Sequence, residues 1–154
     1  MTIKYHNVLA RTAEFGTIAY SSGITPKNQQ SQLGVHFEEV AEMLATLNST
    51  NTKTAELVSR AHSALCNLAT HLKNEPEGLL KIRDRLEFLD SVCDQLVTAT
   101  LSAVLFDMDP VGGLNEVNRS NYSKLVDGVM QKAVVTQKWI KGPSYTPPDL
   151  TPFI

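Results

Sequence analysis

The chain has 154 residues, of which 42% are hydrophobic and 19% charged, and its net charge at pH 7 is −2. This length matches one domain of ordinary size, and the hydrophobic fraction is that of a globular protein rather than a disordered one. The small negative charge gives no reason to expect polyanion binding, and with 6% aromatic residues the chain is unlike a base-stacking platform. We therefore predict a single domain over residues 1–154 that does not bind nucleic acid.

The location and the cysteines are also constrained by the sequence. The N-terminal stretch has no apolar signal core, and no run approaches 18 uninterrupted apolar residues. We therefore expect a soluble cytoplasmic protein with no membrane partner. Cys66 and Cys93 lie in apolar helical contexts without the CxxC spacing of zinc or redox sites, so we expect both to be buried.

Helical periodicity dominates the chain, with turn signals between the periodic stretches. It predicts helices over residues 3–15, 30–47, 55–73, 79–106 and 114–126. The remaining stretch, about 127–154, is rich in proline and predicts an extended C-terminal arm, in which residues 134–136 resemble a short strand. The predicted fold class is all-α, a bundle of about four to five helices with a Pro-containing arm.

An acidic stripe marks the predicted helix over residues 30–47. Positions i, i+3 and i+4 share one face of a helix, so Glu38, Glu39 and Glu42 lie on one arc, with the apolar side chains on the opposite side. Taken alone, these glutamates also fit a solvated helix face.

The second acidic segment has a more unusual environment. Asp94 is the only charged residue between positions 91 and 106, and a helix that is apolar over most of its circumference is normally buried. A buried carboxylate neutralises, finds a partner or binds a cation. Glu87, Asp90 and Asp94 share one narrow arc, and two acidic arcs facing each other would supply the oxygen ligands that Mg²⁺ or Mn²⁺ prefers.

A polar module follows further along the chain. Asn118, Asn121 and Lys124 lie at helical spacing and form a polar module able to hold a phosphorylated ligand, with Lys124 as a point charge. The two asparagines also fit the capping of a turn. The chain has no GxxxxGK[ST], GxGxxG, HExxH or GxSxG motif, which removes the commoner phosphate, dinucleotide, zinc-protease and serine-hydrolase interpretations.

In order and content these motifs resemble the MazG-like all-α nucleoside triphosphate pyrophosphohydrolases, in particular the short single-domain proteins of bacteriophages. The family's Glu-Glu-x-x-Glu element is matched by residues 38–42, and its Ser-Asn-x-Ser-Lys element by residues 120–124. Residues 141–150 are similar to the phage-type tail. The later acidic pair is matched loosely, because either Glu87 or Asp94 could complete it with Asp90.

The resemblance implies hydrolysis of a nucleoside triphosphate, a purine deoxynucleotide such as dGTP or dATP among the candidates, to its monophosphate and pyrophosphate. It implies Mg²⁺ or Mn²⁺ as cofactor and a homodimer or homotetramer that completes the bundle, in the host cytoplasm if the chain is phage-encoded. One glutamate, Glu38 or Glu39, would orient or deprotonate the attacking water. The implied metal ligands are Glu38, Glu39, Glu42, Asp90 and Asp94, and the implied nucleotide-binding residues are Asn118, Asn121, Lys124, Lys141 and Tyr145. The alternative is a helical oligomerisation or nucleotide-binding module without catalysis.

Overall fold

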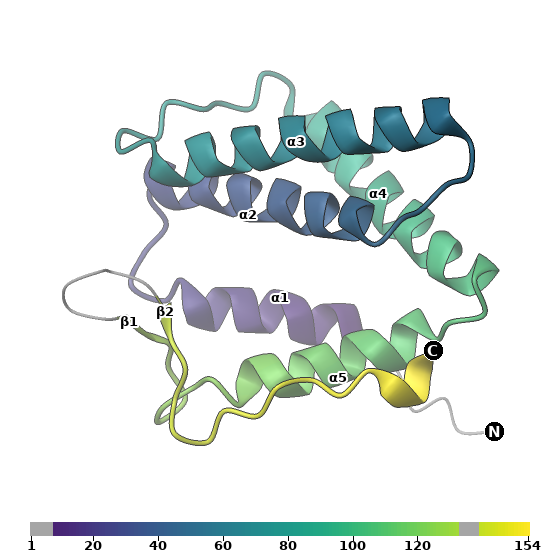
Figure 1. Ribbon diagram of the computed structural model, residues 1–154. Helices are drawn as coiled ribbons and strands as arrows, with labels where there is room; N and C mark the ends of the chain where they lie inside the picture. Colours follow the sequence, from purple (N-terminus) through teal and green to yellow (C-terminus); the bar gives the residue numbers. More distant parts are fainter. Residues whose placement is uncertain (1–7, 133–138) are drawn as a thin grey trace. The chain divides into compact units, whose positions relative to one another are not determined.

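The computed structural model describes residues 8–132 and 139–154, and in these residues the chain forms five α-helices and a two-stranded antiparallel hairpin (Figure 1). The elements are α1 (Val8–Ala19), α2 (Pro26–Ala45), α3 (Thr52–Asn74), α4 (Arg85–Leu105), α5 (Pro110–Tyr122), β1 (Gln131–Lys132), β2 (Trp139–Ile140) and the 3-10 turn η1 (Thr151–Phe153). The mostly helical fold with an extended C-terminal arm is confirmed. The strand predicted at 134–136 lies outside the described residues.

Four of the helices begin at a capping side chain, which shifts their starts from the predicted positions. Thr25, Asn51, Asp84 and Asp109 precede α2, α3, α4 and α5, and each accepts a hydrogen bond from a backbone N–H of the first turn. Such a cap satisfies N–H groups that have no partner within the helix and stabilises it by about 1 kcal/mol. As a result α2, α3 and α5 start earlier than predicted, and α4 starts only at Arg85, so its predicted start at residue 79 is wrong.

The first helix continues past the predicted end at residue 15. α1 runs to Ala19 because Gly16 stays within the helix and its carbonyl accepts a hydrogen bond from the N–H of Tyr20 at 3.1 Å. The predicted start at residue 3 lies outside the described residues. A single glycine lowers helix propensity by about 1 kcal/mol but does not by itself end a helix.

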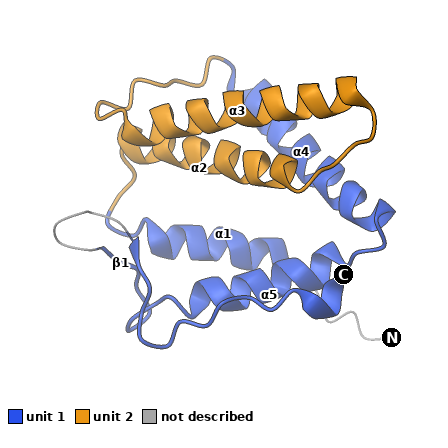
Figure 2. Ribbon diagram, viewed as in Figure 1, with its two compact units in different colours: residues 1–22, 84–154 blue, residues 23–83 orange. Residues whose placement is uncertain are grey.

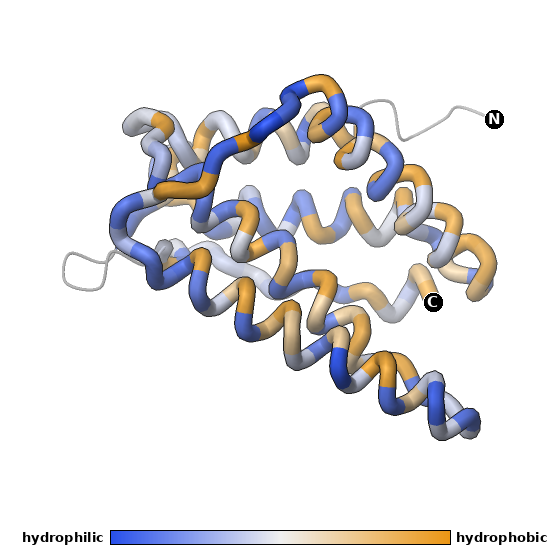
Figure 3. Tube along the Cα trace, turned by 90° about the horizontal axis from the view of Figure 1, so that it is seen from above, coloured by the Kyte–Doolittle hydropathy of each residue, from blue (hydrophilic) through white to orange (hydrophobic). Residues whose placement is uncertain are grey.

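Contacts divide the chain into two compact units (Figure 2). The first unit contains residues 1–22 and 84–154, and the second contains residues 23–83. In both units, apolar residues are interspersed with polar ones along the helices, as expected for amphipathic helices (Figure 3). The prediction of a single domain over residues 1–154 stays a prediction.

The second unit is a pair of helices, α2 and α3, joined by a short loop. Ala41, Ala69 and Leu72 are buried between them. The C-terminal end of α3 is held by Lys27, whose ammonium donates to the carbonyls of Leu72, Lys73 and Glu75. Lysine is suited to this position because the last carbonyls of a helix lack partners and carry partial negative charge.

The loop after α3 lies directly against the start of α2. Gly78 has the left-handed φ of +63°, and a Cβ added there would lie 2.4 Å from the backbone nitrogen of Lys27. Only glycine fits such a conformation next to backbone atoms. The buried amide of Gln30 completes this junction by donating to Leu72 O at 3.3 Å and accepting from Leu80 N at 2.9 Å.

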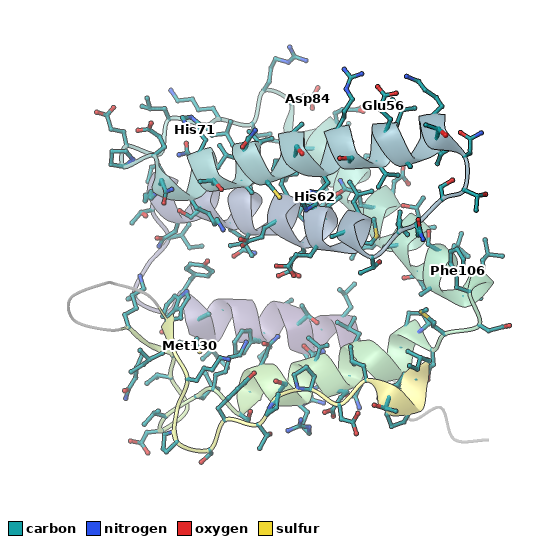
Figure 4. All side chains as sticks on the ribbon, viewed as in Figure 1. Glu56, His62, His71, Asp84, Phe106 and Met130 are labelled. Atoms are coloured by element: carbon teal, nitrogen blue, oxygen red, sulfur yellow. The ribbon has the colours of Figure 1, made fainter. Side chains whose placement is uncertain are left out.

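α4, in the first unit, has mostly exposed side chains. None of its 21 residues is buried. Among the described helices of its unit, α5 alone contacts it. Phe106, which caps its C-terminal end, is 74% exposed (Figure 4). The predicted burial of this segment is therefore wrong for the described structure, as is that of Cys93, whereas Cys66 is half-buried. By length and composition alone, α4 is long and apolar enough to cross a membrane.

Candidate functional site

Asn118 is the best-buried side chain of α5 and connects this helix to α1. Its Oδ1 accepts a hydrogen bond from Thr12 Oγ1 at 3.1 Å, and its Nδ2 donates to the carbonyl of Val8 at 3.0 Å. With 1% of its surface exposed, both polar atoms of the side chain are engaged within the protein. These contacts support a packing role for Asn118, and its predicted contact with a nucleotide stays a prediction.

Asn121 lies in the last turn of α5, and Lys124 lies two residues beyond its end at Tyr122, short of the predicted helix end at residue 126. Lys124 Nζ donates to Asn121 Oδ1 at 2.7 Å, so the structure brings these two side chains together. Their position at the C-terminal end of a helix suits the ammonium, because the terminal carbonyls there are electronegative.

The C-terminal arm brings Lys141 and Tyr145 to the same place. Lys141 Nζ lies 4.2 Å from the centre of the Tyr145 ring. The pKa of the Tyr145 phenol is lowered below its usual value of 10.0, first by a hydrogen bond with Lys141 and then by one with Ser120 and by the charges of Lys141 and Lys124. The side chains of Lys141, Ser120 and Lys124 therefore lie near the Tyr145 phenol.

We call Ser120, Asn121, Lys124, Lys141 and Tyr145 the basic cluster. It contains two ammonium groups, a phenol whose pKa those cations lower, a hydroxyl and an amide. Ammonium groups bind phosphate as point charges, and hydroxyl and amide groups supply hydrogen bonds to its oxygens. The cluster therefore has the chemistry needed to bind a phosphorylated ligand.

The titration of tyrosine tests the geometry of the basic cluster. Tyr145 is expected to ionise at a lower pH than Tyr20, whose pKa is raised by burial, and Tyr122, whose pKa is raised mainly by its hydrogen bond to Glu14. Lys141→Ala removes the main cause and should move the Tyr145 pKa up toward 10.0. Nuclear magnetic resonance of ¹³C-labelled tyrosine resolves each ring. Arg11→Ala is the control, since Arg11 lies over the ring of Tyr122 instead; a Tyr145 pKa that is unmoved by Lys141→Ala would refute the arrangement.

The arm that carries Lys141 and Tyr145 runs antiparallel to α5 along the length of the helix. Its hydrogen bonds join Gly142 N to Lys124 O at 3.0 Å, Thr146 N to Ser123 Oγ at 3.0 Å, Arg119 Nη2 to Pro147 O at 3.0 Å, Asp149 N to Glu116 Oε1 at 3.0 Å, and Asp109 N to Phe153 O at 2.9 Å. These contacts recur from one end of α5 to the other, so the arm is attached along the whole helix. We call residues 141–153 the strap.

The three predicted glutamates of α2 lie in the second unit. Glu38 is half-buried and forms an ion pair with Lys73 of α3, with 2.5 Å between Oε1 and Nζ. Glu39 and Glu42 are exposed. The predicted amphipathic arrangement of α2 is visible in the burial of Ala41 beside the exposed Glu42.

The predicted acids of α4, Asp90 and Asp94, are exposed and belong to the first unit, as does Glu87. Among the described residues, no three His, Cys, Asp or Glu side chains lie close enough together to hold a metal ion. The predicted metal ligands Glu38, Glu39 and Glu42 belong to the second unit, and Asp90 and Asp94 to the first, so the metal site stays a prediction that rests on the resemblance.

One hollow of about 210 Å³ lies in the second unit, at the loop that joins α2 to α3. Its lining includes Leu44, Leu47, Val58 and His62. None of the predicted site residues lines it, so we place the candidate site at the basic cluster and not in this hollow.

Sequence reasoning did not assign a role to three residues that build the site. Ser120 is a buried partner of Tyr145, and Glu116 and Arg119 hold the strap. The spacing of Glu116 and Arg119 predicts an ion pair on one helix face, but nothing local in the sequence indicates that this pair also contacts residues 146–149.

No family model, no curated protein and no solved structure matches this chain.

Proposed function

We propose that this protein is a metal-dependent nucleoside triphosphate pyrophosphohydrolase that converts a (d)NTP to the (d)NMP and pyrophosphate. The observation that supports it best is the basic cluster, in which Lys124 and Lys141 lie around the phenol of Tyr145. Two cations and several hydrogen-bond donors suit a ligand with several phosphate groups. The order of the acidic and Ser-Asn-x-Ser-Lys motifs supplies the reaction class.

In this proposal the residues of the basic cluster bind the substrate. Lys124 and Lys141 neutralise phosphate oxygens, Tyr145 donates its phenol proton, and Asn121 contacts a sugar or phosphate oxygen. Glu38 or Glu39 orients or deprotonates the attacking water. The metal is assigned to Glu38, Glu39, Glu42, Asp90 and Asp94 by the resemblance alone.

We also propose that the working unit is a homodimer or homotetramer. Apolar side chains of α4, including Leu86, Leu89, Leu96 and Val97, are exposed over a helix of 21 residues. Exposed apolar surface of this extent is typical of an interface with a partner.

A second candidate function is nucleotide binding without hydrolysis. It is favoured by the basic cluster, whose two ammonium groups suit a phosphorylated ligand without a metal. The two candidates differ in their need for a metal, because hydrolysis of the anhydride requires one in the resembled family and binding to the basic cluster does not.

The proposal is tested by measuring pyrophosphate release from eight ribo- and deoxyribonucleoside triphosphates with Mg²⁺, with Mn²⁺ and with EDTA. We expect release with either metal and none with EDTA, and the panel reports the base and sugar preference. Binding of the same nucleotides without any turnover would favour the second candidate. Folded protein that neither binds nor hydrolyses any of them would contradict both.

A further inference from the structure

The strap has two anchors on either side of Tyr145. On one side, Gly142 N donates to Lys124 O at 3.0 Å, and Tyr145 N donates back to Gly142 O at 3.1 Å. On the other side, Thr146 N donates to Ser123 Oγ at 3.0 Å, and the Arg119 guanidinium donates to Thr146 Oγ1. The position of the Tyr145 ring therefore depends on both anchors.

The second anchor is organised by an ion pair on α5. Arg119 donates from Nε to Glu116 Oε2 at 2.8 Å and from Nη2 to Glu116 Oε1 at 2.6 Å, which is the bidentate geometry of a guanidinium and a carboxylate. The same guanidinium donates to Pro147 O at 3.0 Å, and the same carboxylate accepts from Asp149 N at 3.0 Å. Each member of the pair therefore fixes the other and also contacts the strap.

The charge of Glu116 is secure at physiological pH. Its pKa is lowered to about 2, mainly by the hydrogen bond with Arg119 and then by that with the N–H of Asp149. The pair therefore stays ionised at neutral pH.

We propose that Glu116 and Arg119 are positioning residues that set Tyr145 against Lys141, Ser120 and Lys124, and so determine how tightly the site holds phosphate. This inference rests on the proposed function, because it assigns the basic cluster to the substrate. Neither residue needs to touch the ligand. They act by holding the segment that follows Tyr145 on α5.

The test uses Arg119→Lys, which keeps the charge but loses the planar fork, and Glu116→Gln, which keeps an acceptor and loses the charge. For Arg119→Lys we expect KM to rise about 10-fold with kcat within about 3-fold of the wild type, because a displaced binding group weakens the substrate complex. Glu116→Gln should have a smaller effect of the same sign. Arg11→Ala is the matched control, since Arg11 also hydrogen-bonds α5, at Asn115, but does not contact the strap.

A second readout separates positioning from a general loss of stability. In Arg119→Lys the pKa of Tyr145 should rise toward 10.0, because the phenol moves away from Lys141 and Ser120, while the pKa of Tyr122 stays constant. Binding of inorganic pyrophosphate, measured by calorimetry, should weaken in parallel.

The outcomes distinguish this inference from the proposed function. If the wild type is inactive but Arg119→Lys still shifts the Tyr145 pKa, the proposed enzymatic function is contradicted and the positioning role is supported. If the wild type is active but Arg119→Lys changes neither KM nor the Tyr145 pKa, the positioning role is contradicted and the proposed enzymatic function is supported.

Discussion

Glu42→Gln and Asp94→Asn are each expected to abolish pyrophosphate release, with kcat/KM reduced by at least about 100-fold, because a lost metal ligand costs more than a lost outer-shell partner. Both carboxylates are exposed on helices, so the circular dichroism of the two variants should match that of the wild type. The measurement is steady-state kinetics of pyrophosphate release with Mg²⁺.

Two further variants sharpen this result. Glu56→Gln is the control, because Glu56 is exposed on α3 and forms ion pairs with Lys53 and Arg60 of the same helix (Figure 4). Glu87→Gln tests the alternative pair of Glu87 with Asp90, and it should retain activity if Asp94 is the residue that completes the pair. Full activity in both Glu42→Gln and Asp94→Asn would remove the metal assignment.

A charge on the apolar side of α4 is expected to convert the oligomer to a monomer. At 100° per residue, Leu89, Val92 and Leu96 share one side of α4, whereas Leu101 follows Asp94 by seven residues and lies on the acidic side. Leu96 and Leu101 are 46% and 54% exposed, so either can be replaced without opening a cavity in the described structure. Leu96→Glu buries a charge if this side is an interface, which costs several kcal/mol.

Sedimentation velocity measures this effect. We expect a dimer or tetramer for the wild type and for Leu101→Glu, and a monomer for Leu96→Glu. Wild-type protein that is monomeric at every concentration would contradict the proposed assembly. An oligomer that survives Leu96→Glu would move the interface away from this side of α4.

The helices were predictable because their signals are local. Periodicity located all five, and the shifted starts also had local signals, since Thr25-Pro26 and Asp109-Pro110 each place a capping side chain before a proline at the first helical position. Asp84 likewise explains why α4 does not begin at residue 79. Giving the caps more weight than the apolar periodicity would have corrected these boundaries.

The site was predictable only in part, because its contacts join distant parts of the chain. The resemblance implies that Lys141 and Tyr145 share a site with Asn121 and Lys124, and the structure brings these four residues to one place. The strap that holds them depends on contacts separated by more than 20 residues, which no spacing rule reports.

Asn118 and α4 show the limits of reading residue types. Asn118 lies at the helical spacing predicted for a ligand-binding residue, but both polar atoms of its side chain form hydrogen bonds with α1. The apolar composition of α4 predicted burial, but composition does not specify what covers a helix, and no residue of α4 is buried.

The most direct test of the central claim is ³¹P nuclear magnetic resonance of a deoxynucleoside triphosphate incubated with the protein and Mg²⁺. The proposed reaction predicts that the three triphosphate signals are replaced by those of the monophosphate and of pyrophosphate, and that EDTA prevents the change. Formation of a diphosphate with orthophosphate, or an unchanged spectrum for every nucleotide of the panel, would contradict it.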